Sequence, residues 1–288
     1  MQDHIEEHFC DPITLNDLSE AAGYSASHSL RIFKELTGIT PFDYIRQYRL
    51  THGAKLLRDK DPKVSDVAAG CVFETHEGFT RAFSKEFGIS PESYREDPIP
   101  VRYFIPYSVL IRHLHKSKRD EKMERKEKKT VFVQTIERPE RKAIIKRGCR
   151  ADNYYEYCDE VGCDVWGVLE SIKSPYEPAG FWLPAKLIRE GTSKYVQGVE
   201  VPLDHKGTIP GGFEVIDLER CSFMIFRGEP FDEEDFEEAI GDVKDSVERY
   251  DPSLDGYEWA CADAPAFQLM PVGSRGYIEA RPVRIMKK

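Results

Sequence analysis

The hydrophobic positions of roughly the first hundred residues follow a helical period, and their pattern occurs twice. Each copy reads as a short helix, a tight turn and a longer helix. Residues of the first copy recur fifty positions later: Arg31, Phe33, Gly38, Ile39, Pro41 and Tyr44 correspond to Arg81, Phe83, Gly88, Ile89, Pro91 and Tyr94. The repeat predicts two helix-turn-helix units in tandem.

The turn and cap residues support this division. In the first unit Thr14 precedes the first helix, Gly23 can adopt the left-handed backbone of a tight turn, and Ser25 is placed to cap the second helix. In the second unit the short helix covers residues 65–71, and Thr75 is the expected cap of the longer one. Upstream of these caps the repeat offset falls by one residue, as expected for a change in a turn.

The longer helix of each unit has an apolar side and a polar side. The apolar residues are Leu30, Ile32, Phe33 and Leu36 in the first unit and Phe79, Ala82, Phe83 and Phe87 in the second. Between the units, residues 41–60 predict one connecting helix with Pro41 in its first turn. Such a helix could place two recognition helices in successive major grooves of DNA. A helical domain whose polar faces meet only solvent is the alternative.

The stretches "LNDLSEAAGYSASHSLRIFKELTGITPFDYIRQYRL" and "VSDVAAGCVFETHEGFTRAFSKEFGISPESYR" resemble the AraC-type DNA-binding domain, over roughly residues 3–97. The resemblance implies sequence-specific regulation of transcription at promoter DNA, with RNA polymerase as a further candidate partner. It also implies base contacts near the amino ends of the longer helices, at Ser27, Leu30, Arg31, His76, Glu77, Thr80 and Arg81. The adjacent polar positions His28, Lys34 and Thr75 complete the candidate DNA-binding set.

Three positions depart from the family pattern. Ser29 and Leu30 reverse the usual apolar–polar order, so a core contact or a base contact has moved. Val72 stands where the family has a turn glycine, and a β-branched residue is strained at positive φ. Gly53 replaces an alanine in the connecting helix, at a cost of about 1 kcal/mol in helix propensity.

The charge of this region weakens the DNA prediction. Residues 1–97 hold 11 Lys+Arg against 17 Asp+Glu, a net charge of 11 − 17 = −6, whereas phosphate binding needs positive charge. The position of the cations matters more than their sum. The cations that we expect in or beside the helices that face DNA are Arg31, Lys34, Arg46, Arg49, Arg81 and Lys85. Because the net charge is negative, we expect weaker nonspecific binding than a basic domain would show.

Residues 98–129 are predicted to be the linker between two domains. They begin rich in proline, become apolar, and then hold 10 Lys+Arg against 4 Asp+Glu, a net charge of 10 − 4 = +6. A solvated tether is the favoured interpretation of the charged part, although its excess charge could contact phosphates. His113 and His115 alternate as on a strand, but without Cys or carboxylate spacing nearby they do not predict a metal site.

The pattern changes at residue 130 to strands that alternate with acidic helices. Residues 130–137, 141–148, 181–188 and 194–202 have strand character, with helical sequence over 153–172; the second round is 213–219, 221–228, a helix within 231–250, 266–272 and 276–285. The fold class we predict is multidomain: an all-α double helix-turn-helix domain over 1–97, and an α+β domain over 130–288 built from two similar βαββ-type halves. About 160 residues are enough to bury an independent core.

These halves resemble the GyrI-like effector-binding domain, through "YVQGVEVP", "GGFEVIDLERCSFMIFRGEPFDEEDFEEAIGDV" and "GYEWACADAPAFQLMPV". The resemblance implies a cleft between the halves that binds bulky, often cationic lipophilic molecules, as in multidrug sensing, above a carboxylate that falls on Glu258. The tyrosine of the family's short motif is absent from "YEWA". Glu200, in an apolar strand, is the alternative carboxylate.

A carboxylate between aromatic rings attracts an organic cation through charge and through the ring quadrupoles. The aromatic candidates are Trp166, Trp182, Phe226 and Trp259. Core packing is the simpler interpretation of any one of these rings, and an exposed strand edge is an equal alternative for Glu258.

The remaining features fit a cytoplasmic regulator. Seven cysteines lack metal-finger spacing and are expected to be reduced, buried thiols. No membrane-length apolar run or signal-peptide pattern occurs. We therefore expect a ligand-responsive transcription regulator that needs no catalytic residues, cofactor or metal. The alternatives are that the carboxy-terminal domain hydrolyses hydrophobic toxins or sequesters a protein.

Overall fold

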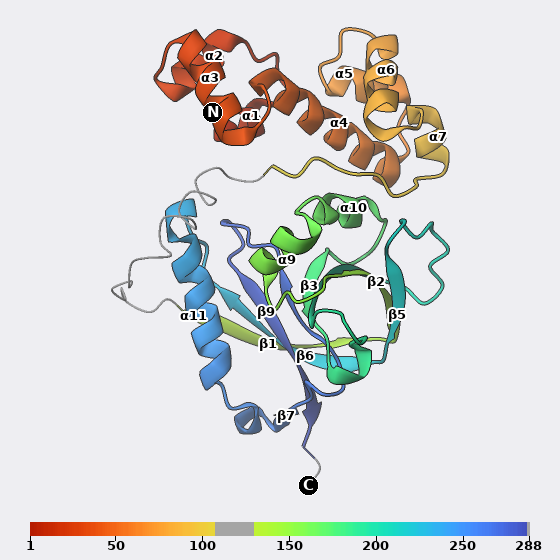
Figure 1. The fold of residues 1–288 in the computed structure, drawn as a ribbon, viewed down its shortest axis with the longest axis vertical. Coiled ribbons are helices and arrows are strands. Elements are labelled where there is room, and N and C mark those ends of the chain that lie inside the picture. The colour runs from red at the N-terminus through yellow and green to blue at the C-terminus, as the bar shows by residue number, and fades with distance from the viewer. Residues whose placement is uncertain (107–129, 287–288) are drawn as a thin grey trace. The chain divides into compact units, whose positions relative to one another are not determined.

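The computed structural model describes residues 1–106 and 130–286. The chain divides into two compact units, one helical and one built on a β-sheet (Figure 1). The two-domain layout predicted from the sequence is therefore confirmed.

The helical unit consists of α1 Gln2–His8, α2 Leu15–Ala22, α3 Ala26–Thr37, α4 Pro41–Lys60, α5 Val64–Gly70, α6 His76–Phe87 and α7 Pro91–Glu96. Helices α2 and α3 form the first predicted helix-turn-helix, α5 and α6 form the second, and α4 connects them (Figure 1). Helix α1 was not predicted. It contributes the fully buried Ile5 to the core of the first unit.

Local side-chain chemistry fixes the helix ends. The Thr14 hydroxyl accepts a hydrogen bond from the Asp17 amide, and the Asp17 carboxylate accepts one from the Thr14 amide, a complete capping box. Thr75 caps α6 as predicted by accepting from the Gly78 amide at 3.0 Å. Ser25 occupies the equivalent position before α3 but makes no side-chain cap hydrogen bond. Gly23, in the turn, has φ 68°.

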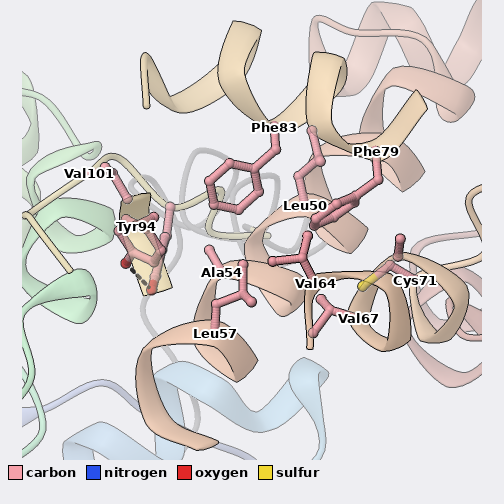
Figure 2. Close-up of a cluster of buried hydrophobic side chains, with 12 residues drawn as sticks. Leu50, Ala54, Leu57, Val64, Val67, Cys71, Phe79, Phe83, Tyr94 and Val101 are labelled. Carbon is pink, nitrogen blue, oxygen red and sulfur yellow. Dashed lines mark hydrogen bonds between the residues drawn. The ribbon is translucent and has the colours of Figure 1, made fainter. Parts of the chain in front are cut away.

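Each helix-turn-helix unit packs its own side of α4. The first core is small and consists of Ile5, Leu18, Phe33, Tyr44 and Ile45. The second is larger, and Figure 2 shows labelled side chains of α4, α5, α6 and α7 that belong to it. Its buried residues come from these helices and from the segments that follow α5 and α7: Leu50, Ala54, Leu57, Val64, Val67, Ala68, Cys71, Phe79, Phe83, Tyr94, Val101 and Tyr103.

The close approach of α5 and α6 to α4 explains Gly53. A Cβ atom there would lie 3.2 Å from both the Cys71 sulfur and the Phe79 ring. The glycine loses helix propensity but lets the second unit pack tightly on the connecting helix.

The first residues of the predicted linker pack onto the helical unit. Val101 and Tyr103 are buried in the second core, and the Tyr103 and Tyr94 hydroxyls are hydrogen-bonded at 2.9 Å (Figure 2). The Phe104 amide donates to the Thr51 hydroxyl of α4 at 2.9 Å. This segment therefore joins the helical unit although it has no helix or strand of its own. His113 and His115 lie outside the described residues, and the predicted limits 98–129 stay a prediction.

The second unit contains β1 Val131–Arg138, β2 Arg141–Arg147, α9 Tyr154–Val161, α10 Val165–Ser171, β3 Ala179–Trp182, β4 Tyr195–Val201, β5 Glu214–Leu218, β6 Cys221–Gly228, α11 Phe236–Arg249, β7 Tyr257–Trp259, β8 Ala266–Leu269 and β9 Ile278–Ile285. Three short 3₁₀ turns cover Ala185–Leu187, Glu233–Asp235 and Pro252–Asp255. The strand predicted over 181–188 is wrong in its second half: β3 ends at Trp182, and after Pro184 the chain forms a 3₁₀ turn.

The strands of the described residues form one antiparallel sheet in the order β1-β6-β9-β8-β3-β4-β2-β5, with β7 on β9. Strands β2, β3 and β4 with α9 and α10 make one strand–helix–strand–strand half, and β6, β8 and β9 with α11 make the other. The halves meet where β3 pairs with β8. Each half exchanges its preceding strand: β1 pairs with β6 of the second half, and β5 pairs with β2 of the first.

Alternation along the strands separates the two faces of the sheet. In β2, Ile144 packs beneath α9 and α10, whereas Ile145 points to the opposite face. In β6, Met224 packs beneath α11, whereas Phe223 joins Ile145 in the opposite core. The helices of both halves therefore cover the same face, with the central strands β3, β8, β4 and β9 between them.

Candidate functional site

Helix α3 presents most of the predicted first-unit DNA contacts to solvent. Ser27, Arg31 and Lys34 are exposed, and His28 and Leu30 are half-buried. The Arg31 guanidinium lies 3.2 Å from Nδ1 of His28. This contact orients the Arg31 side chain along the outer face of the helix.

The reversed order of Ser29 and Leu30 has a structural consequence at both positions. Ser29 points into the core, where it is 1% exposed and its hydroxyl has no hydrogen-bond partner among the described residues. Leu30 occupies the half-buried position at the edge of the recognition face. In the second unit the equivalent residues are Phe79, which is fully buried, and Thr80. The core contact and the candidate base contact have therefore both changed in the first unit.

Helix α6 carries the second set. Glu77 and Arg81 are exposed, and Thr80 is half-buried. His76, at the first turn, lies 3.4 Å from the Glu92 carboxylate of α7. The Thr75 hydroxyl is already engaged as the helix cap, so it is a positioning residue for α6 before it is a DNA contact.

Val72 adopts the left-handed backbone that a turn glycine would take, with φ 58° against 68° at Gly23. The turn geometry is therefore preserved, and the cost falls on stability. A left-handed conformation costs a residue with a Cβ about 1–2 kcal/mol.

Two of the cations expected in or beside the DNA-facing helices contact other groups of the helical unit. Arg49 donates to the carbonyl oxygens of Phe9 and Asp11, at 2.8 and 2.6 Å, and so ties α4 to the turn after α1. Arg46 forms an ion pair with Asp43 one turn earlier, at 2.9 Å. The hydrogen bonds of Arg49 direct its guanidinium into the helical unit.

In the sheet unit the predicted carboxylates are both already paired with arginines. Glu258 lies on the edge strand β7, about half exposed, with its carboxylate 2.6 Å from Arg284. Glu200 is 1% exposed and forms ion pairs with Arg141, at 2.7 Å, and with Arg138. Glu200 is on the face of the sheet opposite to the helices, because it alternates with Val199 of the helix-side core.

The aromatic candidates divide between core and site. Phe226 is fully buried under α11, with Trp259 and Tyr250 rings beside it. Trp166 is buried in α10. Trp182 is only half-buried, and its indole nitrogen donates to the Asp152 carbonyl oxygen at 3.0 Å. Of the predicted rings, Trp182 lies beside a cluster of polar and aromatic side chains around one buried carboxylate.

That cluster lies on the helix side of the central strands, where the two halves meet, and sequence reasoning missed its carboxylate. Glu279 of β9 is 1% exposed. It accepts hydrogen bonds from the Tyr277 hydroxyl, at 3.3 Å, and from the Arg281 guanidinium, at 2.6 Å. Gln268 of β8, which pairs with Glu279, also accepts from Tyr277 at 2.8 Å.

Aromatic rings from the first half complete the cluster. The Tyr195 hydroxyl accepts from the Gln268 amide at 3.1 Å, and its ring lies 5.4 Å from that of Trp182. Burial raises the pKa of Tyr195 and, beside Glu279, that of Tyr277, so both hydroxyls stay protonated and can donate. Gly180 of β3 makes room, because a Cβ there would overlap the Tyr195 hydroxyl.

The same cluster already holds a cation that belongs to the chain. The Arg281 guanidinium pairs with Glu279 and lies 5.7 Å from the centre of the Trp182 ring. A planar cation between a carboxylate and an indole is the chemistry that binds organic cations. The alternate spacing of Tyr277, directly before β9, and of Glu279 and Arg281 within it is the sequence signal that could have found the cluster.

In residues 1–106 and 130–286 no group of three or more His, Cys, Asp or Glu side chains could hold a metal ion. Over the same ranges no helix is sufficiently long and apolar to cross a membrane.

Comparison with known proteins identifies the helical unit. A family model described as a helix-turn-helix domain matches residues 18–97. The right origin-binding protein of Escherichia coli (strain K12) is 38% identical over 94 residues, which is 33% of this chain and 32% of that protein. The probable transcription factor PqrA of Proteus vulgaris is 38% identical over 85 residues, 30% of this chain and 70% of that protein.

One solved structure matches a larger share of the chain at low similarity. The structure of SAV2435 bound to tetraphenylphosphonium covers 53% of this chain and 94% of its own, at 14% identity and a TM-score of 0.34. That score is too low to establish a shared fold.

The two tandem units and their matches define a DNA-binding helix-turn-helix domain. The chain belongs to the AraC family of transcription regulators. It spans about a third of the length of the origin-binding protein it matches.

Proposed function

We propose that this protein is a transcription regulator that binds promoter DNA through α3 and α6 and responds to a lipophilic organic cation bound at the Glu279 cluster. The DNA-binding half rests on the family membership and on the two exposed recognition faces that α4 joins. No reaction is required of the cluster, so we propose a sensor and not an enzyme.

The buried Glu279 carboxylate is the observation that carries the ligand proposal. An ionised carboxylate inside a protein needs a cation or several donors to offset its lost hydration. Here Arg281 supplies the cation, and its side chain is about one-third exposed, so it can move aside toward solvent. An arriving organic cation would replace the guanidinium between Glu279 and Trp182 while Tyr277 continues to donate to the carboxylate.

Opposite substitutions in the cluster test the ligand proposal. With tetraphenylphosphonium as the probe, Glu279→Gln is expected to weaken binding about tenfold or more, which corresponds to 1.4 kcal/mol. Arg281→Met is expected to strengthen binding, because it removes the internal competitor. Weakening by both variants would mean that the pair only supports the fold, and would overturn the proposal.

Glu258→Gln is the matched control, since Glu258 is also paired with an arginine on the same sheet. Binding unchanged by Glu258→Gln and reduced by Glu279→Gln assigns the ligand carboxylate to Glu279. The opposite result would return that role to Glu258, as the sequence resemblance implied.

The DNA-binding proposal is tested by Arg31→Ala and Arg81→Ala. Each should weaken specific binding to a promoter fragment by about 1–3 kcal/mol, as expected for loss of one base-reading side chain. Arg220→Ala, an exposed and paired arginine of the sheet unit, is the control for loss of one positive charge. Equal affinity for the wild-type protein and both helix variants would refute the docking.

A further inference from the structure

Two cysteines meet at the end of α9. Cys158 lies in the last turn of the helix, and Cys163 follows the helix by two residues. Between them Gly162 has φ 101° and ψ 146°, and its amide donates to the Cys158 carbonyl oxygen at 3.0 Å. The chain thereby turns back on the end of the helix, and this backbone turn brings Cys163 close to Cys158.

The two thiols differ in exposure. Cys163 is exposed and Cys158 is half-buried. All seven cysteines are reduced in this structure, but the expectation that they are buried is wrong: only Cys71 is buried, and Cys10, Cys149, Cys163 and Cys261 are exposed. A dissolved oxidant can therefore reach Cys163 directly, whereas the half-buried Cys158 is less accessible to it.

We propose that Cys158 and Cys163 form a reversible disulfide when the protein meets a hydroperoxide. The exposed Cys163 thiolate attacks a peroxide oxygen, the O–O bond breaks, and the released alkoxide or hydroxide takes up a proton. Cys163 is now a sulfenic acid. The Cys158 sulfur attacks it, the S–O bond breaks, water leaves, and the S–S bond forms. Two thiols supply the two electrons that reduce one peroxide, and a dithiol reductant reverses the change.

The surroundings favour a disulfide over a metal site. A structural zinc ion takes four ligands, and within the described ranges no third His, Cys, Asp or Glu joins these thiols in a metal-binding group. The ring closed by the disulfide spans only residues 158–163, and the hydrogen bond from the Gly162 amide to the Cys158 carbonyl oxygen already folds this segment, so closure orders little additional chain.

The environment also makes Cys158 the second thiol to react. Its hydrogen bond with Cys163, its burial and the negative charge of Asp159 raise the pKa of Cys158, whereas the Tyr154 hydroxyl lowers it. The thiolate is the nucleophile in disulfide chemistry. Cys158 therefore resolves the oxidised Cys163 and does not meet the oxidant first.

The test uses the full chain, treated with hydrogen peroxide and then alkylated. Trypsin should release residues 151–173 as one peptide that contains both cysteines, because no Lys or Arg lies between Arg150 and Lys173. We expect this peptide to lose the mass of two hydrogen atoms, to resist alkylation, and to recover both thiols after dithiothreitol. Two alkylated cysteines in the peroxide-treated protein, or irreversible oxidation of Cys163 without a link, would overturn the proposal.

Single substitutions separate the two roles. In Cys158→Ser the Cys163 sulfenic acid should persist and be trapped by dimedone, whereas in Cys163→Ser peroxide should leave Cys158 largely unmodified. Cys149→Ser is the matched control, an exposed cysteine near the start of the same helix, and it should still lose two thiols on oxidation. Equal oxidation of Cys158 with and without Cys163 would contradict the assigned order.

Discussion

The two helix-turn-helix units share one backbone plan but stabilise it differently. The first has the better turn and the smaller core: Gly23 fits its left-handed turn, whereas Ser29 fills a buried position without a hydrogen-bond partner. The second has Val72 in the strained turn and Phe79 in the core position equivalent to Ser29. A duplicated fold can therefore tolerate a defect in a turn or in a core, provided that the other part of the same unit is well formed.

The largest expected difference between the units lies in their cores. Phe79→Ala should cost about 3–5 kcal/mol, because it removes a fully buried ring packed between Phe73 and Phe83. Amide hydrogen exchange on the full chain would show the loss as faster exchange in α5 and α6, and Ser29→Ala is the control at the equivalent position. Similar effects of the two substitutions would remove the contrast between the cores.

Substitutions in the turns should lower the stability of the first unit and raise that of the second. Gly23→Val should destabilise the first unit by about 1–2 kcal/mol, because valine must then adopt positive φ. Val72→Gly should stabilise the second unit by a smaller amount, since glycine relieves the strain but orders a more flexible chain. Exchange rates in each unit measure both effects. If Val72→Gly accelerates exchange, Val72 contributes packing that exceeds its backbone strain.

Ser29→Ala should stabilise the first unit by about 1 kcal/mol. The substitution removes a buried hydroxyl that has no partner and introduces the best helix former. Slower exchange in α2 and α3, with α5 and α6 unchanged, is the expected result. A loss of protection would indicate that the hydroxyl is satisfied in solution, for example by a bound water molecule.

The helix caps give the smallest expected contrast. Thr75→Ala should cost about 1 kcal/mol, because the Gly78 amide loses its acceptor. Ser25→Ala should cost less, since Ser25 makes no cap hydrogen bond. Amide hydrogen exchange in the first turns of α6 and α3 measures the difference between the two costs. Equal costs would mean that Ser25 caps α3 in solution.

The helical unit was largely predictable because its determinants are local. Thr14, Gly23 and Thr75 act on backbone groups within three residues, and the two ends of α4 are marked by Pro41 in its first turn and basic residues in its last. Helix α1 was missed because burial of Ile5 depends on a fold that already exists. The hydrogen bonds of Arg49 could not be predicted for a similar reason, since its partners lie about forty positions earlier in the sequence.

The carboxylate of the sheet unit could not be chosen from the sequence because strand pairing is not local. Glu258 and Glu279 both lie in short strand-like segments of mixed polarity. Only the pairing of β9 with both β6 and β8 makes Glu279 central and buried, and only the edge position of β7 leaves Glu258 exposed. The strand register therefore decides which of the two carboxylates is buried among aromatic side chains.

Because the halves exchange strands β1 and β5, truncation of the sheet unit between the halves would leave strands unpaired. A product truncated after β4 would retain β1 without β6, its partner, and β2 without β5 at its outer edge. Both unpaired edges would invite aggregation. The two halves therefore depend on each other for completion, and neither is expected to survive as an autonomous module despite its repeated plan.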